Sequence, residues 1–397
     1  MKEKPLTNLR LPDLWKEFNR NFNESFWEEL EQRMKLMKKK FIELALQEEI
    51  TALTGAQKYE RTPERVYRRN GYWNRYIILK DGKLQLNMPR LRETGFQSKI
   101  IPRYIRRQSQ IDEILKQIFI YGASTRLTAK ALKPLIGEVS AQTISNIAKS
   151  LDEEAKKFHR REITEKYMYL FLDAIVLKIK TGIGSKSRAV LAAYGVTVQG
   201  IRQIIDFRVV DTESENKWTG FLQNLQTRGL TDDTLSLIVT DGSKALENAV
   251  DNVFPLVLRQ RCWAHKMRNV ANYLRKKDEK ECLFEAKKIY SAENLREAKR
   301  NFQLWESKWG RLYPKAVECI RKNWEQLTAF YKTPKSLWKK LRTTNIIERA
   351  FREVRRRTRT MSCFNNVESI ERIIFAVISH LNEKWRNTPI YEFTQNY

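Results

Sequence analysis

The spacing of apolar residues predicts a long helix at the start of the chain. Residues 9 to 54 place apolar side chains at steps of three or four, which is typical of one helical face. The stripe consists of Phe18, Phe22, Phe26, Leu30, Met34, Met37, Phe41 and Leu44. At 1.5 Å per residue the helix would span roughly 65 Å, which exceeds one small core. We therefore expect it to pair with a helix of a second copy, or to form a hairpin broken near Lys38.

The pattern changes between residues 60 and 160. Two apolar runs, 76–79 and 84–88, flank Asp81-Gly82, a favoured tight-turn pair, and predict a β-hairpin. Its arginines and aromatics suit contact with a DNA backbone, or simply a solvated basic hairpin. Helices are then predicted at 111–121, at 124–135 and from Ser140 or Ala141, with Ser140 as N-cap and Gly137 in the turn.

The last of these helices resembles the recognition helix of a helix-turn-helix. It would bring five polar residues near DNA base edges, although plain helical packing gives the same pattern. These residues are Gln142, Thr143, Ser145, Asn146 and Lys149.

A strand-rich region follows. Strands are predicted at 167–180, 187–197, 201–210, 235–240 and 253–258, with helices at 213–228 and 243–252. Residues 266–340 are helical and rich in tryptophan, and two further helices are predicted at 343–358 and 367–385. The fold class is therefore α/β, with a mixed-sheet core interrupted by an all-helical insertion and preceded by mainly helical DNA-binding domains.

This pattern predicts six segments. They are an N-terminal helical and possibly dimerising segment (1–58), a basic hairpin region (59–107), a helix-turn-helix (108–162), the first part of the core (163–265), the helical insertion (266–340) and the second part of the core (341–397).

The charge balance indicates a polyanionic partner. The chain has 75 Lys and Arg residues against 47 Asp and Glu residues, a formal net charge of +28. Counterion release drives such surfaces onto phosphates, so nucleic acid is favoured as the partner over a ribosomal-type or merely soluble basic protein. No apolar run is long enough for a membrane span and no signal-peptide core is present, so we expect an intracellular, cytoplasmic protein. The four cysteines lack paired C-x-x-C spacing and suggest reduced thiols.

Three acidic residues are candidates for catalysis. Asp173 interrupts an apolar run, Asp241 directly follows one, and Glu348 lies in a predicted helix far downstream. Three carboxylates can hold two Mg²⁺ or Mn²⁺ ions on a phosphodiester, which activates an oxygen nucleophile and neutralises the leaving oxygen. Each has an ordinary alternative: a polar strand face for Asp173, a simple Asp-Gly turn for Asp241 and a capping box for Glu348.

Basic and sulfur-bearing residues surround these acids. Arginines near Glu348 suit a phosphate track, because guanidinium groups grip two oxygens at once. They are Arg342, Arg349, Arg352, Arg355, Arg356, Arg357 and Arg359. Cys262 and His265 have the spacing of half a zinc site, but a structural zinc needs four ligands and no suitable second pair exists. We expect His265 to support the carboxylates or contact a phosphate, and Cys262 to pack in the core.

The segment from Asp241 through Ala245-Leu246, Val253-Phe254-Pro255, Gln260, Cys262 and His265 resembles the signature of Mutator-type transposases of bacterial insertion sequences. Thr343-Thr-Asn-Ile-Ile-Glu348-Arg resembles the region of that family's third catalytic acid. The likeness covers the whole chain. One departure is Ala245, where the family usually has glycine.

This resemblance implies a ribonuclease H-like core with a DDE triad of Asp173, Asp241 and Glu348 and dependence on two Mg²⁺ or Mn²⁺ ions. It implies a homodimer that binds terminal inverted repeats, cleaves transposon ends and joins the 3′-OH to target DNA, often through a circular intermediate. The alternatives are a structure-specific DNA nuclease and a catalytically inactive DNA-binding regulator.

Overall fold

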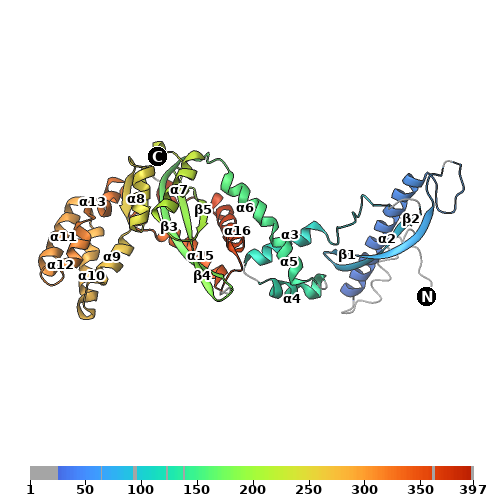
Figure 1. Ribbon diagram of the computed structural model, residues 1–397, viewed down its shortest axis with the longest axis horizontal. Helices are drawn as coiled ribbons and strands as arrows, with labels where there is room; N and C mark the ends of the chain where they lie inside the picture. Colours follow the sequence, from blue (N-terminus) through green and yellow to red (C-terminus); the bar gives the residue numbers. More distant parts are fainter. Residues whose placement is uncertain are drawn as a thin grey trace. The chain divides into compact units, whose positions relative to one another are not determined.

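The computed structural model describes residues 26–63, 65–92, 96–121, 124–136, 139–359 and 363–394 (Figure 1). Their contacts divide the chain into two compact units. The first comprises residues 1–119 and 123–147, and the second comprises 120–122 and 148–397. None of the described helices combines the length and apolar content that crossing a bilayer requires.

The first unit begins with a helix packed on a β-hairpin. Helix α2 (Phe26–Thr54) covers β1 (Arg69–Leu79) and β2 (Gly82–Leu91), and Leu46 of the helix lies in the same buried cluster as Leu84 and Leu86. Gly82 adopts a φ of +102°, which explains the Asp-Gly turn. The hairpin is confirmed and is longer than predicted. The part of the predicted long helix before Phe26 lies outside the described residues.

Three short helices complete this unit. They are α3 (Ser109–Tyr121), α4 (Thr125–Ile136) and α5 (Ala141–Ala148), and they pack around Ile111, Leu115 and Ile144. The Ser140 hydroxyl accepts the Thr143 N–H at 3.1 Å, so the predicted N-cap is confirmed. Gly137 lies outside the described residues.

A five-stranded sheet organises the second unit. Its strands are β3 (Tyr167–Lys180), β4 (Ser185–Thr197), β5 (Arg202–Val210), β6 (Leu237–Thr240) and β7 (Leu258–Arg261). They lie in the order β5-β4-β3-β6-β7. The first three pair antiparallel as consecutive neighbours, whereas β6 and β7 run parallel to β3.

The predicted strand at 253–258 is wrong. Helix α8 (Lys244–Val253) extends through the start of that apolar run, and the strand begins only at Leu258. Phe254 and Val257 are buried in a turn, where the Phe254 N–H still bonds to Val250 O. Pro255 has no N–H to give to a strand ladder, so these apolar residues contribute to the core without pairing.

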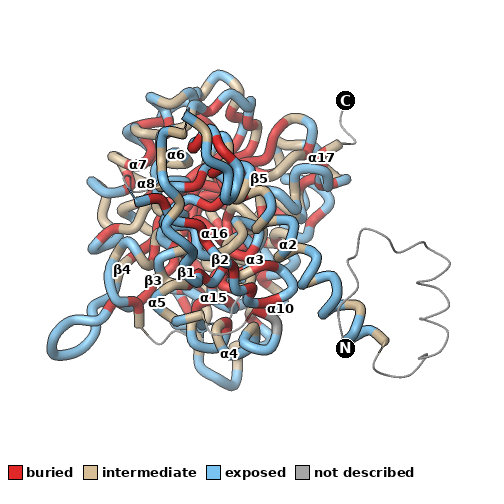
Figure 2. The backbone as a smooth tube through the Cα atoms, turned by 90° about the vertical axis from the view of Figure 1, so that its right-hand side faces the viewer, coloured by how far each residue is buried: buried red, intermediate tan, exposed pale blue. Residues whose placement is uncertain are grey.

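Helices cover both faces of the sheet. On one face, α7 (Glu215–Thr227) and α8 bury Trp218, Phe221 and Leu246 against Leu170 and Leu172. The other face carries α6 (Ser150–Arg160), α15 (Asn345–Thr358) and α16 (Val367–Arg386). Because side chains alternate along a strand, Asp173 points to the second face, together with Phe171 and Ile175. In Figure 2 buried residues lie mainly toward the middle of the view, and exposed loops lie at its edge.

The helical insertion follows β7. It comprises α9 (Trp263–Ala271), α10 (Lys276–Tyr290), α11 (Leu295–Trp309), α12 (Pro314–Arg321), α13 (Trp324–Thr328) and α14 (Trp338–Leu341), and α17 (Tyr391–Thr394) lies near the end of the chain. Trp305 and Trp309 are buried and donate to Cys282 O and Glu285. Gln260 of β7 fastens the insertion to the sheet, since its amide bonds to Leu327 O and to the Phe330 N–H.

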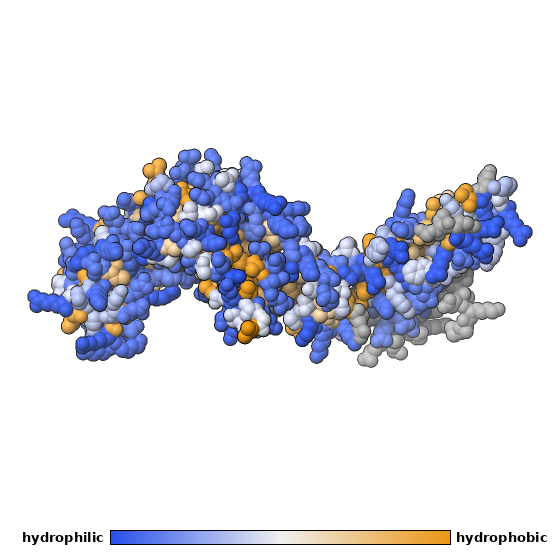
Figure 3. Space-filling view, in the orientation of Figure 1, coloured by the Kyte–Doolittle hydropathy of each residue, from blue (hydrophilic) through white to orange (hydrophobic). Residues whose placement is uncertain are grey.

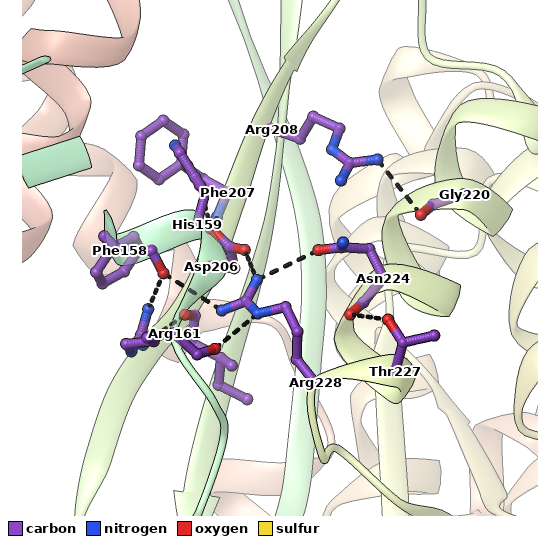
Figure 4. Close-up of polar contacts among 11 residues, drawn as sticks. Phe158, His159, Arg161, Asp206, Phe207, Arg208, Gly220, Asn224, Thr227 and Arg228 are labelled. Atoms are coloured by element: carbon purple, nitrogen blue, oxygen red, sulfur yellow. Dashed lines mark hydrogen bonds and ion pairs between the residues drawn. The ribbon is translucent and has the colours of Figure 1, made fainter. Parts of the chain in front are cut away.

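A buried acid joins α6 and α7 to the sheet (Figure 4). Asp206 of β5 is only 2% exposed and contacts His159 Nδ1 at 2.6 Å, the Phe207 N–H at 2.8 Å and the Arg228 guanidinium. Arg228 also donates to the carbonyl oxygens of Arg161 and Phe158. The Arg228 guanidinium therefore links the C-terminal end of α6 to β5.

We predict that Arg228→Met lowers the free energy of unfolding by about 3–5 kcal/mol, because it leaves a buried carboxylate without its cation. Chemical denaturation checks this. Arg208→Met is the matched control, since Arg208 lies on β5, the strand of Asp206, and donates to Gly220 O at 3.3 Å without contacting a carboxylate among the described residues. The control should cost about 1 kcal/mol, and an equal loss in both variants would contradict the assignment.

Candidate active site

The register of two parallel strands brings Asp173 and Asp241 together. Leu172 of β3 pairs with Thr240 of β6, so the two acids occupy the next position on neighbouring strands. Adjacent strands lie about 4.8 Å apart. The sheet therefore holds two carboxylates side by side where β6 ends, which is where ligands commonly bind in sheets with parallel strands.

Asp173 is held in a desolvated position. It is 9% exposed, and its Oδ1 accepts the Ala174 N–H at 2.8 Å. Burial raises the pKa of Asp173 to about 7, and the nearby carboxylates of Asp241 and Glu348 add to the rise. Asp241 and Glu348 therefore lie close enough to Asp173 to disfavour its charged form.

Asp241 sits in a turn built around a neighbouring arginine. Its Oδ1 accepts the Ser243 N–H at 2.9 Å, and Ser243 caps α8. Gly242 has a φ of +88°, and a Cβ there would collide with the Arg261 guanidinium, which donates to Gly242 O. The Asp-Gly pair thus forms a turn, and the close contact of Gly242 with Arg261 restricts where the Asp241 carboxylate can lie.

Glu348 approaches from α15 and faces the start of α9. Its Oε1 lies 3.8 Å from His265 Nε2, 3.9 Å from an Arg268 nitrogen and 3.3 Å from the Thr344 hydroxyl. Thr344, the residue before α15, makes no side-chain capping bond to the helix. The capping-box alternative for Glu348 is therefore not what the structure shows.

Cys262 connects the strand end to this helix. Its N–H donates to Thr240 O at 2.8 Å, and its Sγ accepts from the N–H and the hydroxyl of Thr344, each at 3.3 Å. Burial opposes ionisation of the Cys262 thiol, but hydrogen bonds from His265 and Thr344 hold its pKa below the ordinary value. The same hydrogen bond to Cys262 raises the pKa of His265. Cys262 is buried, as predicted, but it also fixes the start of α15 beside Asp241.

The carboxylates stand near one another without forming a closed ligand set. Among the described residues, no group of three His, Cys, Asp or Glu side chains is arranged to hold a metal ion as it stands. The donors themselves are oxygen atoms of acids, the type that Mg²⁺ prefers.

One face of α15 carries Glu348 together with five exposed arginines. At 3.6 residues per turn these residues fall within an arc of about 120°. They are Arg349, Arg352, Arg355, Arg356 and Arg359. Arg342 is half-buried and donates to Tyr290 O at 2.6 Å. Arg357 is a correction to the predicted track, because it lies on the opposite side, is 3% exposed and donates to Ile120 O.

Four of the five residues predicted to read DNA bases lie on α5 in the first unit, whereas Lys149 follows α5 and belongs to the second unit. Gln142, Asn146 and Lys149 are exposed, whereas Thr143 and Ser145 are half-buried. Gln142 and Asn146 hydrogen-bond to one another at 3.0 Å along the face of α5. Amide side chains so placed could pair with adenine edges. In the nearby hairpin Arg75 is buried and donates to backbone carbonyls such as Pro102 O, so this arginine is structural.

Sequence reasoning missed two residues of the site. In the sequence, Thr344 has only the features of a possible helix cap. Arg261 adjoins Cys262, but no pattern marks it as part of the site. Their roles depend on contacts with Cys262 and Gly242, which lie 82 and 19 residues away. No local sequence pattern identifies such contacts, because the partners lie on different segments of the chain.

We predict that Asp173→Asn stabilises the metal-free protein at pH 8. The carboxyl has a folded pKa of about 7 against 3.8 for the ordinary group, so the folded state holds its proton longer than the unfolded chain. Below pH 4 the Asp173 carboxyl is protonated in both states and does not disfavour folding. As the pH rises towards 7 the folded state becomes less stable relative to the unfolded chain, because only the unfolded chain readily releases this proton. The variant should gain roughly 2–4 kcal/mol at pH 8, and the gain should shrink towards pH 4.

Denaturation in a chelating buffer at several pH values checks this, with Asp233→Asn at an exposed position as control. A gain that does not vary with pH would show that the Asp173 carboxyl is not desolvated.

Comparison with known proteins places this arrangement in a family. Residues 16–388 match the model of the family described as "Transposase, Mutator family". The chain is 35% identical over 347 residues to the transposase for insertion sequence element ISRM5 of Rhizobium meliloti (strain 1021), covering 87% of each chain. It is 32% identical to the transposase for element IS905 of Lactococcus lactis subsp. lactis (strain IL1403), covering 85% of this chain and 86% of the relative. It is also 32% identical to the transposase for element IS256 in transposon Tn4001 of Staphylococcus aureus, covering 83% and 85%. The chain belongs to the Mutator family of transposases.

Proposed function

We propose that the chain is a DDE transposase that cleaves transposon ends and joins the freed 3′-OH to target DNA, using Asp173, Asp241 and Glu348. The observation that carries this proposal is the pairing of Leu172 with Thr240, which sets two acids on neighbouring parallel strands. The sheet order, three antiparallel strands followed by two parallel ones, supports a ribonuclease H-like core.

The three acids would hold two Mg²⁺ or Mn²⁺ ions, with Asp173 and Asp241 shared and Glu348 completing the second site. Bound there, the ions would activate an oxygen nucleophile and neutralise the leaving oxygen of a phosphodiester. The desolvated Asp173 supports this, because a carboxylate shielded from water attracts a bound cation more strongly than an exposed carboxylate does.

The chain's own residues would position the DNA around this centre. His265 and Arg268 face Glu348 and can also donate to phosphate oxygens on the same side. The exposed arginines of α15 extend from Glu348 and would grip the strand. Water would attack first at the transposon end, and the liberated 3′-OH would then attack the target phosphodiester in line.

Recognition of the terminal inverted repeats would lie in the first unit. Helix α5 presents Gln142 and Asn146 in the manner of a recognition helix, and Lys149 follows directly after it. Two ends must be brought together for transposition, which a homodimer would do. Hydrophilic residues cover most of the visible surface of the described chain (Figure 3), and the formal net charge of +28 makes a polyanionic substrate suitable.

We predict that Asp173→Asn, Asp241→Asn or Glu348→Gln each lowers cleavage of an inverted-repeat end in Mg²⁺ by at least about 10³-fold, because each removes a charge needed in the transition state. Binding of the same DNA should change less than about threefold. Gel assays of cleavage and binding check both, and Asp233→Asn should behave as the unmodified protein.

Full cleavage by any of the three variants would remove that residue from the triad. Cleavage of branched DNA in preference to inverted-repeat ends would instead favour a structure-specific nuclease.

A second prediction concerns the arginines of α15. Arg352→Gln with Arg355→Gln should reduce the slope of log binding constant against log salt by about 2, because each lost phosphate contact lowers it by about 0.9. Arg296→Gln with Arg300→Gln, at exposed positions of α11, is the charge-matched control. Equal effects in the two double variants would mean that only net charge matters.

A further inference from the structure

An apolar stripe runs along the exposed side of α2. Trp27 is 70% exposed, Phe41 is 74% exposed and Leu44 is 63% exposed, and Met34 and Met37 are also exposed. Leu30 completes the row at a half-buried position. In Figure 2 the beginning of this helix is coloured as exposed or intermediate, without buried residues. A surface helix normally turns polar residues to solvent, so this stripe needs a partner.

The stripe does not belong to the core of its own unit. Contact with the hairpin is made by Ile42 and Leu46, which lie on the other side of the helix. Glu43 accepts the Asn87 N–H at 2.8 Å, and Glu49 accepts the Ser98 hydroxyl at 2.6 Å. The helix is thus anchored by one side and presents the stripe away from that anchor.

The spacing of the stripe specifies the kind of partner. Its six residues follow one another at steps of three, four, three, four and three. This is the 3.5-residue repeat of a coiled coil, in which the partner is a helix with the same repeat. A groove of about 590 Å³ lined by Leu44, Tyr72 and Lys40 continues the surface on one side.

The distribution of charge favours a second copy in antiparallel orientation, which the order of steps also allows. The steps read the same in both directions, so a reversed copy matches Trp27 with Leu44, Leu30 with Phe41, and Met34 with Met37. Residues 27–35 contain three acids and two basic residues, whereas residues 36–44 contain three lysines and one acid. They are Glu28, Glu29, Glu31, Arg33 and Lys35, and then Lys38, Lys39, Lys40 and Glu43. An antiparallel pair sets the net acidic half of one helix against the net basic half of the other, whereas a parallel pair sets one basic half against the other.

We propose that two copies of the chain associate through antiparallel pairing of their α2 helices over residues 27–44. This names the surface for the homodimer in the proposed function and rests on that part of it alone. The interface is isologous, because each helix offers the same stripe to the other. DNA binding and the acid triad are not needed for it to form.

The first test measures the molar mass of the full chain without DNA, by light scattering over a range of concentrations. We expect twice the chain mass for the unmodified protein. Phe41→Glu should raise the dimer dissociation constant by roughly 100-fold or more, since it places a charge in the seam. Leu36→Glu is the matched control, because Leu36 is 51% exposed on the same helix but lies off the stripe; it should remain a dimer.

The second test distinguishes the orientation. Leu30→Cys and Phe41→Cys are prepared as separate proteins and oxidised alone and mixed. An antiparallel pair gives a cross-linked dimer only in the mixture, because equivalent positions 30 and 30′ lie roughly 16 Å apart. A parallel pair cross-links each protein alone, which would overturn the orientation. The unmodified chain, with its four native cysteines, sets the background.

An unmodified chain that stays monomeric, or equal effects of Phe41→Glu and Leu36→Glu, would overturn the proposal. The first result would assign the stripe to another segment of the same chain or to a different protein. Cleavage of inverted-repeat ends is measured on the same samples. A monomeric chain that still cleaves these ends would show that the interface proposal fails while the proposed chemistry holds. A dimer that does not cleave them would show that the proposed chemistry fails while the interface proposal holds.

Discussion

The parallel pairing of β3 with β6 is the constraint on which the site depends. A shift of this register by one residue would turn either Asp173 or Asp241 to the opposite face of the sheet. The register is secured by the apolar residues around it. Leu170, Leu172 and Ile238 are fully buried under α7 and α8. The core on one face of the sheet therefore fixes the positions of acids on the other face.

Cys262 connects the sheet to α15, the helix that carries the third acid, Glu348. It bonds to Thr240 through its N–H and to Thr344 through its sulfur, so the residue before Asp241 and the residue before α15 share one partner. The insertion between β7 and α15 is long, yet Gln260 and Cys262 bring both of its ends back to the sheet. A large helical segment is thus accommodated without loosening Glu348.

Much of this could be predicted from the sequence where side-chain periodicity is strong. Strand β3 was predicted at its observed ends, and α15 and α16 within two residues, because a long apolar run or a long stretch of helical spacing leaves little choice. The strand at 253–258 failed since apolar residues such as Phe254 can be buried in a turn as well as in a strand. Arg357 was misjudged because composition alone does not reveal which side of a helix is covered. Thr344 and Arg261 depend on contacts between distant segments, which spacing does not encode.

Glu348 and the exposed arginines project from the same side of a single rigid rod. If the arginines hold a DNA strand as proposed, a displacement of that strand would be passed to the Glu348 carboxylate through one continuous helix. A substitution that changed the tilt of α15 to suit a new target would then also change the position of Glu348.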